Sequence, residues 1–264
     1  MGNPPGSFIW YELMTTDADA AGAFYNAVVG WTFSGREPGS PVDYRMIGRS
    51  DGGMNGGVLS LTAEMQQQGA RPGWFAYLHV ADVDAAVAAI QADGGKVLMP
   101  KTTIEVGSFA FVTDPQGVPF YVMSPIPPAD KPDATSDVFS PDEPQHVRWN
   151  ELGSPDLAAA KAFYAKHFGF EFNNVMPMGP MGDYCFIDHH GQALGAIMQQ
   201  QNTGQPAMWL PYFGVPSTMA AKVAIEASGG TVLSGPHEVP GEDWVVVASD
   251  PQGAVFGVVG PKGE

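Results

Sequence analysis

The sequence is poor in cysteine and in positive charge, and each shortage excludes classes of function. Cys185 is the only cysteine among 264 residues, so no intrachain disulfide and no cysteine-based zinc site can form. Lysine and arginine number 12 against 28 aspartates and glutamates, which gives a formal net charge of −16. Such a chain repels phosphate backbones and anionic lipid surfaces, so we expect no nucleic-acid and no membrane partner. A cationic or neutral ligand is favoured instead.

Long apolar runs and targeting features are also lacking. No run of the sequence approaches the roughly 18–20 apolar residues that a transmembrane helix needs. The first residues, Met1–Ser7, contain neither a basic stretch nor a long apolar stretch, so they do not resemble a secretory signal. Together with the single cysteine, these observations predict a cytoplasmic protein.

Apolar residues and turn formers, by contrast, are plentiful. Hydrophobic residues make up 44% of the chain, which is too many for a wholly disordered protein and enough for a buried core. The 33 glycines and 24 prolines indicate many short elements joined by tight turns. The length fits one large domain or two ordinary ones.

The chain contains one pattern twice. Segments 8–33 and 147–172 are identical at 11 of 26 aligned positions, with an offset of 139 residues. Further matches follow in the same order, and each copy carries an Asp-Pro-Gln-Gly turn, at 114–117 and 250–253. So many ordered matches indicate an internal duplication.

The duplication sets the expected domain organisation. We place a first module at residues 1–124 and a second at residues 146–264. The segment between them, 125–145, is rich in proline and poor in apolar residues, which is typical of an extended linker. We expect the modules to pack as an intramolecular pseudo-dimer in a monomer or a homodimer.

Hydrophobic periodicity and turn residues predict the same elements in both modules. The first helix is expected to begin after Thr16 or Asp17 in module 1 and after Ser154 in module 2, and to end at Gly30 and Gly169. The remaining predictions are strands at 9–14, 44–48, 57–61, 74–80, 108–113 and 119–123 with a helix at 83–92, and strands at 148–153, 184–188, 193–198, 209–215, 244–248 and 255–259 with a helix at 218–227.

Several motifs carry a resemblance to a known family. Asp-x-x-x-Ala-x-x-Phe-Tyr occurs at 156–164 and again at 17–25, and Val-x-Asp-Val-Asp-Ala-Ala occurs at 80–86. With the two Asp-Pro-Gln-Gly turns, this ordered set resembles the vicinal oxygen chelate superfamily, which includes glyoxalase I, bleomycin-resistance proteins and extradiol dioxygenases. The resemblance implies an α+β fold of tandem duplicated βαβββ glyoxalase-like modules that form curved, cup-shaped mixed sheets.

The resemblance also implies where a metal would bind. Metal enzymes of this superfamily hold a divalent ion with His, Glu or Gln at three recurring strand positions. Metal sites need several N, O or S donors that converge on one point, and here only tyrosine could serve. We therefore expect the usual divalent metal site to be absent, with any other cofactor unknown. The matching positions hold Trp10, Phe75 and Tyr121 in module 1 and Trp149, Leu210 and Gly257 in module 2.

Three residues are candidate catalytic groups. Glu12 and Glu151 each share a strand face with a tryptophan two residues earlier. Such a carboxylate can accept a hydrogen bond from a ligand or act as a general base. His79 shares a face with Phe75 and Tyr77, and if that face meets Glu12 the pair could transfer a proton. A purely structural role is the alternative for all three.

Six aromatic residues are candidate ligand-binding residues, because aromatic cups bind planar or cationic molecules by stacking and by cation–π attraction. The alternative is that these side chains pack in the core. They are Trp10, Phe75, Tyr77, Tyr121, Trp149 and Tyr212. Two histidines, His189 and His190, precede a glycine in a predicted hairpin turn, where we expect solvent-exposed side chains.

These observations favour one function and leave two others open. The leading hypothesis is metal-independent binding of a small organic molecule, aromatic or cationic, in an aromatic-lined cup. The second is a lyase, isomerase or dioxygenase of the same superfamily that uses Glu12, Glu151 or His79, with or without a divalent metal. The third is an interaction protein that has no small ligand.

Overall fold

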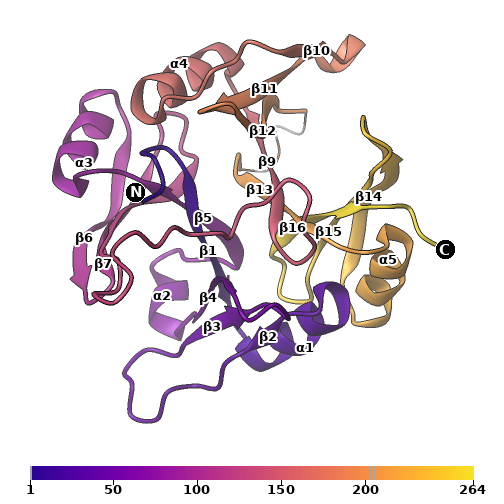
Figure 1. Cartoon of the computed structure of the whole chain (residues 1–264), viewed down its shortest axis with the longest axis horizontal. Coiled ribbons are helices and arrows are strands. Elements are labelled where there is room, and N and C mark those ends of the chain that lie inside the picture. Colours follow the sequence, from indigo (N-terminus) through magenta and orange to yellow (C-terminus); the bar gives the residue numbers. More distant parts are fainter. Residues whose placement is uncertain (1, 202–203, 205) are drawn as a thin grey trace. The chain divides into compact units, whose positions relative to one another are not determined.

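The computed structural model describes residues 2–201, 204 and 206–264. Within that part of the chain, no helix is both long and apolar enough to cross a membrane. Module 1 contains β1 (Phe8–Thr15), α1 (Ala18–Val29), β2 (Thr32–Phe33), β3 (Tyr44–Gly48), β4 (Met54–Ser60), α2 (Ala63–Gln67), β5 (Gly73–His79), α3 (Val83–Ala92), β6 (Lys96–Ile104), β7 (Gly107–Thr113) and β8 (Pro119–Pro125) (Figure 1).

Module 2 repeats this order, adds a short 3₁₀ helix after β10, and has no counterpart of α2 among its described residues. Its elements are β9 (Val147–Ser154), α4 (Leu157–Phe168), β10 (Val175–Pro177), the short 3₁₀ helix η1 (Gly179–Met181), β11 (Asp183–His189), β12 (Gln192–Gln199), β13 (Trp209–Gly214), α5 (Thr218–Ala227), β14 (Thr231–Glu238), β15 (Trp244–Ser249) and β16 (Val255–Gly260).

Each module contains two βαβββ motifs with the same strand order. The motifs of module 1 are ordered β2-β3-β4-β1 and β5-β8-β7-β6, and those of module 2 are ordered β10-β11-β12-β9 and β13-β16-β15-β14. In each motif the first strand pairs in parallel with the last, as β1 does with β4, and the other pairs are antiparallel. The predicted α+β fold of tandem βαβββ modules with mixed sheets is therefore confirmed.

The first helix of each module begins at an aspartate. The side chain of Asp17 accepts from the backbone N–H of Ala20 at 2.9 Å, and Asp156 caps α4 in the same way. The Ser154 cap predicted for module 2 is wrong. Its hydroxyl instead donates to Oε1 of Gln116 at 2.6 Å, because Ser154 is still the last residue of β9.

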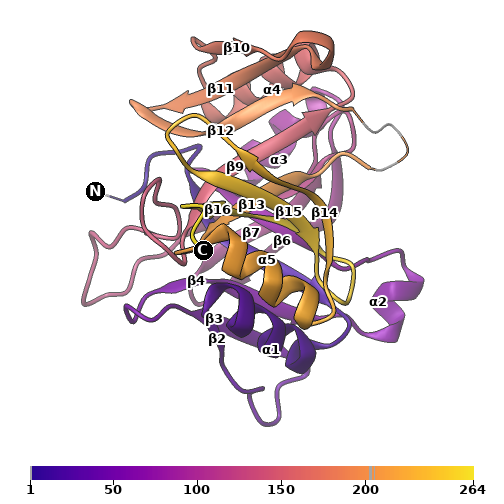
Figure 2. The ribbon, with the colours of Figure 1, turned by 90° about the vertical axis from the view of Figure 1, so that its right-hand side faces the viewer.

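The chain also divides into two compact units that cut across the modules. Unit 1 comprises 1–9, 75–136 and 149–209, so it contains α3 and α4. Unit 2 comprises 10–74, 137–148 and 210–264, so it contains α1 and α5, which lie side by side in Figure 2. Each unit thus takes one motif from each module. The module boundaries proposed from the sequence stay a prediction.

A buried hydrogen-bonded chain joins the two motifs within each unit. In unit 2, the hydroxyl of Tyr25 on α1 accepts from Nε1 of Trp74 at 2.8 Å and donates to Oδ2 of Asp250 at 3.2 Å. In unit 1, Tyr164 on α4 makes the same contacts with Trp209 at 3.1 Å and with Asp114 at 3.3 Å. The tyrosine that ends the Asp-x-x-x-Ala-x-x-Phe-Tyr motif of one module therefore contacts the Asp-Pro-Gln-Gly turn of the other.

Burial determines the ionisation of these chains. Burial raises the pKa of Tyr25 and Tyr164 well above the usual value of 10.0, and the charge of the neighbouring aspartate adds to this. Burial also raises the pKa of Asp114 and Asp250 above 3.8, although backbone N–H groups of each turn oppose the shift. The two tyrosines are therefore neutral donors that hold a helix to a turn.

One local prediction about exposure is wrong. His189 was expected to lie in a solvated turn, but only 4% of it is exposed. Its Nε2 atom lies 2.9 Å from the carbonyl oxygen of Pro5, and its ring packs edge-on against Phe170. The N-terminal segment covers this side of the hairpin, which the local sequence of the turn does not reveal. His190 is exposed, as expected.

Candidate functional site: two tryptophan–tyrosine–glutamate arrays

In unit 2, two of the predicted site residues meet through a tyrosine of β3. Trp10 and Glu12 lie on one face of β1, and Nε1 of Trp10 donates to the hydroxyl of Tyr44 at 3.0 Å. Tyr44 also hydrogen-bonds to Glu12. Glu12 is 3% exposed, whereas Trp10 and Tyr44 are partly exposed. Burial, then the charge of Glu12, raises the pKa of Tyr44 well above its usual value.

In unit 1, the equivalent residues of module 2 form the same arrangement. Nε1 of Trp149 donates to the hydroxyl of Tyr184 at 2.8 Å, and that hydroxyl donates to Oε2 of Glu151 at 2.7 Å. Here all three side chains, Glu151 included, are partly exposed. Burial, followed by the charge of Glu151, raises the pKa of Tyr184. We call these two sets the Trp–Tyr–Glu arrays.

The array fixes a carboxylate beside an indole ring. The tyrosine stays neutral, so its hydroxyl is a permanent donor to the glutamate and a permanent acceptor for the indole N–H. The remaining lone pairs of a partly exposed carboxylate can accept hydrogen bonds or attract a cation. Sequence reasoning found the tryptophans and the glutamates but missed Tyr44 and Tyr184, although both belong to the internal repeat.

Three further predicted residues form an aromatic ladder across β5, β8 and β7 in unit 1. The rings of Tyr77 and Tyr121 stack at 4.1 Å, and Tyr121 stacks on its other side with Phe111 at 4.3 Å. Phe75 packs edge-on against Phe111 at 5.2 Å. Tyr77, Tyr121 and Phe75 are each at most 8% exposed, whereas Phe111 and the neighbouring Phe109 are partly exposed. A ligand would therefore meet this ladder mainly at the two phenylalanines.

His79 ends β5 in unit 1. Its backbone pairs with the segment before β1, through Gly6 and Ser7. Its Nδ1 atom is buried and has no hydrogen-bond partner within the described residues. Glu12, the partner considered for proton transfer, belongs to unit 2. The last aromatic candidate, Tyr212 of unit 2, is 5% exposed and lies against Gly257, where a Cβ would come within 2.2 Å of the ring.

The residues at the usual metal positions do not fit a divalent ion. Tyr121, the single oxygen donor among them, has its ring stacked between two others. Gly257 has no side chain, and the ring of Tyr212 fills the space beside it. Within the described residues, no three His, Cys, Asp or Glu side chains are grouped so as to hold a metal.

A comparison with known families assigns the chain. A sequence model of the Glyoxalase/Bleomycin resistance protein/Dioxygenase superfamily matches residues 7–122 and 144–258. The chain belongs to this superfamily. The match covers both modules, so it confirms the family resemblance drawn from the motifs.

Two curated relatives illustrate the range of similarity. The protein named "Putative glyoxylase CFP32" of Mycobacterium tuberculosis is 32% identical over 259 residues, which cover 96% of this chain and 94% of the relative. The anthracycline biosynthesis protein DnrV of Streptomyces peucetius is also 32% identical, over 134 residues that cover 46% of this chain and 47% of the relative.

Solved structures share the fold at low sequence identity. A Mn(II)-bound glyoxalase from Novosphingobium aromaticivorans superposes with a TM-score of 0.62 at 18% identity and covers 98% of this chain and 83% of its own. A variant of homoprotocatechuate 2,3-dioxygenase from Brevibacterium fuscum gives a TM-score of 0.66 at 16% identity, over 97% and 72% of the two chains. At these identities the likeness concerns the fold alone.

Proposed function

We propose that the protein binds a small organic molecule that carries a planar aromatic or cationic group, and that it does so without the divalent metal customary in its superfamily. The observation that carries this proposal is the Trp–Tyr–Glu array of module 2. It presents an indole and a carboxylate, both partly exposed and held in register by a 2.7 Å and a 2.8 Å hydrogen bond. A cation gains from both groups at once.

Neighbouring aromatic side chains support the same ligand class. Phe186 of β11, also partly exposed, packs edge-on against Trp149 at 5.9 Å and against Tyr184 at 5.5 Å. Fixed rings contact a planar ligand at little entropic cost. The formal charge of −16 speeds the approach of a cation. The relatives named for anthracycline biosynthesis also favour an aromatic ligand.

The array can be tested with proflavine, a planar aromatic cation. We expect chelator-treated protein to bind proflavine saturably, as measured by quenching of tryptophan fluorescence. Glu151→Gln keeps the shape of the side chain but removes its charge, so we expect about a tenfold loss of affinity. Glu238→Gln is the matched control, because Glu238 is exposed on β14. Equal losses in both variants, or binding only after a divalent metal is added, would contradict the proposal.

A second candidate is an enzyme that uses His79 for proton transfer. The observation that favours it is the buried Nδ1 atom of His79, which has no partner in the described chain. A ring nitrogen without a partner can exchange a proton with a reacting molecule once the side chains that cover it move aside. His79→Gln should then abolish turnover of any substrate found by screening, while Glu238→Gln leaves turnover intact. Unchanged turnover in His79→Gln would remove this candidate.

A further inference from the structure

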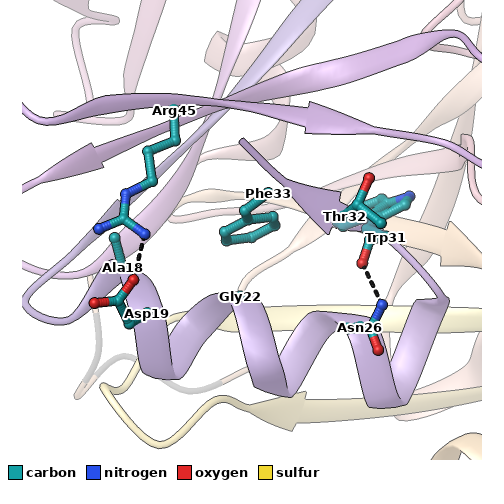
Figure 3. A pocket seen from close by; sticks show the side chains of 8 residues that line it. All are labelled: Ala18, Asp19, Gly22, Asn26, Trp31, Thr32, Phe33 and Arg45. Atoms are coloured by element: carbon teal, nitrogen blue, oxygen red, sulfur yellow. Dashed lines mark hydrogen bonds and ion pairs between the residues drawn. The ribbon is translucent and has the colours of Figure 1, made fainter. Parts of the chain in front are cut away.

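A groove lies beside α1 in unit 2, apart from the Trp–Tyr–Glu array. It has a volume of about 320 Å³. Figure 3 shows Phe33 over Gly22 of α1, with Arg45 and Asp19 at one end and Asn26, Thr32 and Trp31 at the other. A Cβ built on Gly22 would lie 3.2 Å from the ring of Phe33. The ring of Phe33 therefore packs closely against Gly22, and a longer side chain at position 22 would crowd this part of the groove.

The repeat shows what occupies the equivalent place in module 2. With the offset of 139 residues, Gly22 corresponds to Lys161 and Phe33 corresponds to Phe172. The ammonium group of Lys161 lies over the ring of Phe172, 5.5 Å from its centroid. Module 2 thus places a primary ammonium over this ring, whereas module 1 has a glycine at the equivalent position. Glycine lowers the stability of a helix interior, so α1 keeps this position without a side chain at some cost.

The charges at the end of the groove suit a cation. Nε and Nη2 of Arg45 bind both oxygens of Asp43 at 3.0 and 3.1 Å, while Nη1 binds Oδ1 of Asp19. The guanidinium of Arg45 is thus shared between two carboxylates, and the charge of Arg36 also acts on Asp43. The side chain of Arg45 is 11% exposed and that of Asp19 is 86% exposed. An incoming cation therefore meets the carboxylate of Asp19 before the guanidinium.

We propose that this groove binds the ammonium group of a small primary alkylamine, over the ring of Phe33 and beside the carboxylate of Asp19. The alkyl chain follows the surface that the absent side chain of residue 22 would cover, as the stem of Lys161 does in module 2. The proposal is independent of ligand binding at the Trp–Tyr–Glu arrays, because it rests on different residues.

The test uses n-butylammonium chloride and the full-length, ¹⁵N-labelled protein at low ionic strength. Backbone amide resonances of residues 18–33 should shift saturably, with a dissociation constant of about 1–10 mM for so small a ligand. n-Butanol, which has the same chain without the charge, should leave them unchanged. Asp19→Asn, at an exposed position, should weaken binding several-fold.

A matched pair of lysine variants separates filling of the groove from added charge. Gly22→Lys reproduces the arrangement of module 2 and should abolish the saturable shifts. Ala23→Lys adds the same charge at the next, exposed position of α1 and should retain them. Three results would each overturn the proposal: shifts that persist in Gly22→Lys, shifts that n-butanol reproduces, or shifts that are lost equally in Ala23→Lys. If Gly22→Lys does not fold, the affinity of Asp19→Asn decides between the outcomes.

Discussion

The two Trp–Tyr–Glu arrays have the same hydrogen bonds but differ in what surrounds the carboxylate. In module 1, Glu12 is 3% exposed, whereas in module 2 Glu151 is partly exposed. The strand beside each glutamate also differs. Gly57 of β4 is the register partner of Glu12, and Ala196 of β12 is the partner of Glu151. Duplication has thus preserved one array as a closed structure and left the other open, and the proposed ligand binding concerns the open one.

A second difference lies one residue before Gly56 of β4 and the equivalent Gly195 of β12. Asn55 of module 1 is 0% exposed, and neither its Nδ2 nor its Oδ1 atom has a hydrogen-bond partner in the described chain. The equivalent residue of module 2 is Leu194, which is 4% exposed. A buried amide without partners costs stability that a leucine does not. Module 1 therefore carries a polar cost that module 2 avoids.

Exchanging these two residues should produce the largest effects. Leu194→Asn removes a buried apolar side chain and introduces an unpaired amide, so we expect the free energy of unfolding to fall by about 3 kcal/mol. Asn55→Leu should raise it by about 1–2 kcal/mol. Urea denaturation of both variants measures the two values. Loss of stability in Asn55→Leu would show that the amide has partners under solution conditions, and the comparison would fail.

Removing the central hydroxyls should distinguish the closed array from the open one. Tyr44→Phe leaves the indole N–H of Trp10 without its acceptor and takes a donor from buried Glu12, which should cost about 2 kcal/mol. Tyr184→Phe should cost only about 0.5–1 kcal/mol, because water can reach Glu151. The measurement is again the free energy of unfolding at pH 7. Equal costs would mean that the two arrays are equally closed.

Gly57 and Ala196, the register partners of the two glutamates, should help to determine where the tyrosine ring of each array lies. A Cβ on Gly57 would lie 2.0 Å from the hydroxyl of Tyr44, so Gly57→Ala should displace that ring and cost about 1 kcal/mol. Ala196→Gly is the converse change, and its cost of about 1–1.5 kcal/mol should come from backbone entropy and from the loss of a fully buried methyl group. The indole N–H resonance of Trp10 should shift in the NMR spectrum of the first variant, while that of Trp149 should keep its position in the second. An unchanged Trp10 spectrum would contradict the steric account.

The smallest effect is a pH dependence that both units should share. The folded-state pKa of Asp250 is raised by burial above 3.8. Its contribution to stability is therefore fully present below pH 3.8 and is lost as the pH rises through the folded-state value. The unfolding free energy of Asp250→Asn minus that of the wild type should rise with pH across this window, and Asp114→Asn should behave alike. A difference that falls with pH would refute the assigned direction.

The sequence predicted the fold well because the fold depends on local signals that occur twice. Both second helices, Val83–Ala92 and Thr218–Ala227, have the predicted bounds. The strands β6 and β14 were missed, since most of their residues are exposed and they lack the alternation of apolar and polar side chains that marks a half-buried strand.

The site was less predictable because it depends on partners from other strands. Strand periodicity correctly placed Trp10 and Glu12 on one face, and Trp149 and Glu151 likewise. It could not reveal Tyr44 or Tyr184 as the link, because that contact depends on the register between neighbouring strands. The groove beside α1 escaped notice for a similar reason, since a glycine in a helix signals nothing until its neighbours are known.

The most direct test of metal-independent binding combines two readings on one sample. Protein purified without chelator or affinity metal is analysed for its elements, and the same preparation is titrated with proflavine before and after treatment with chelator. We predict substoichiometric metal, saturable binding that the chelator leaves unchanged, and loss of binding in Glu151→Gln. Near-stoichiometric zinc, nickel, manganese or iron, with binding lost on chelation and restored by the metal, would contradict the account.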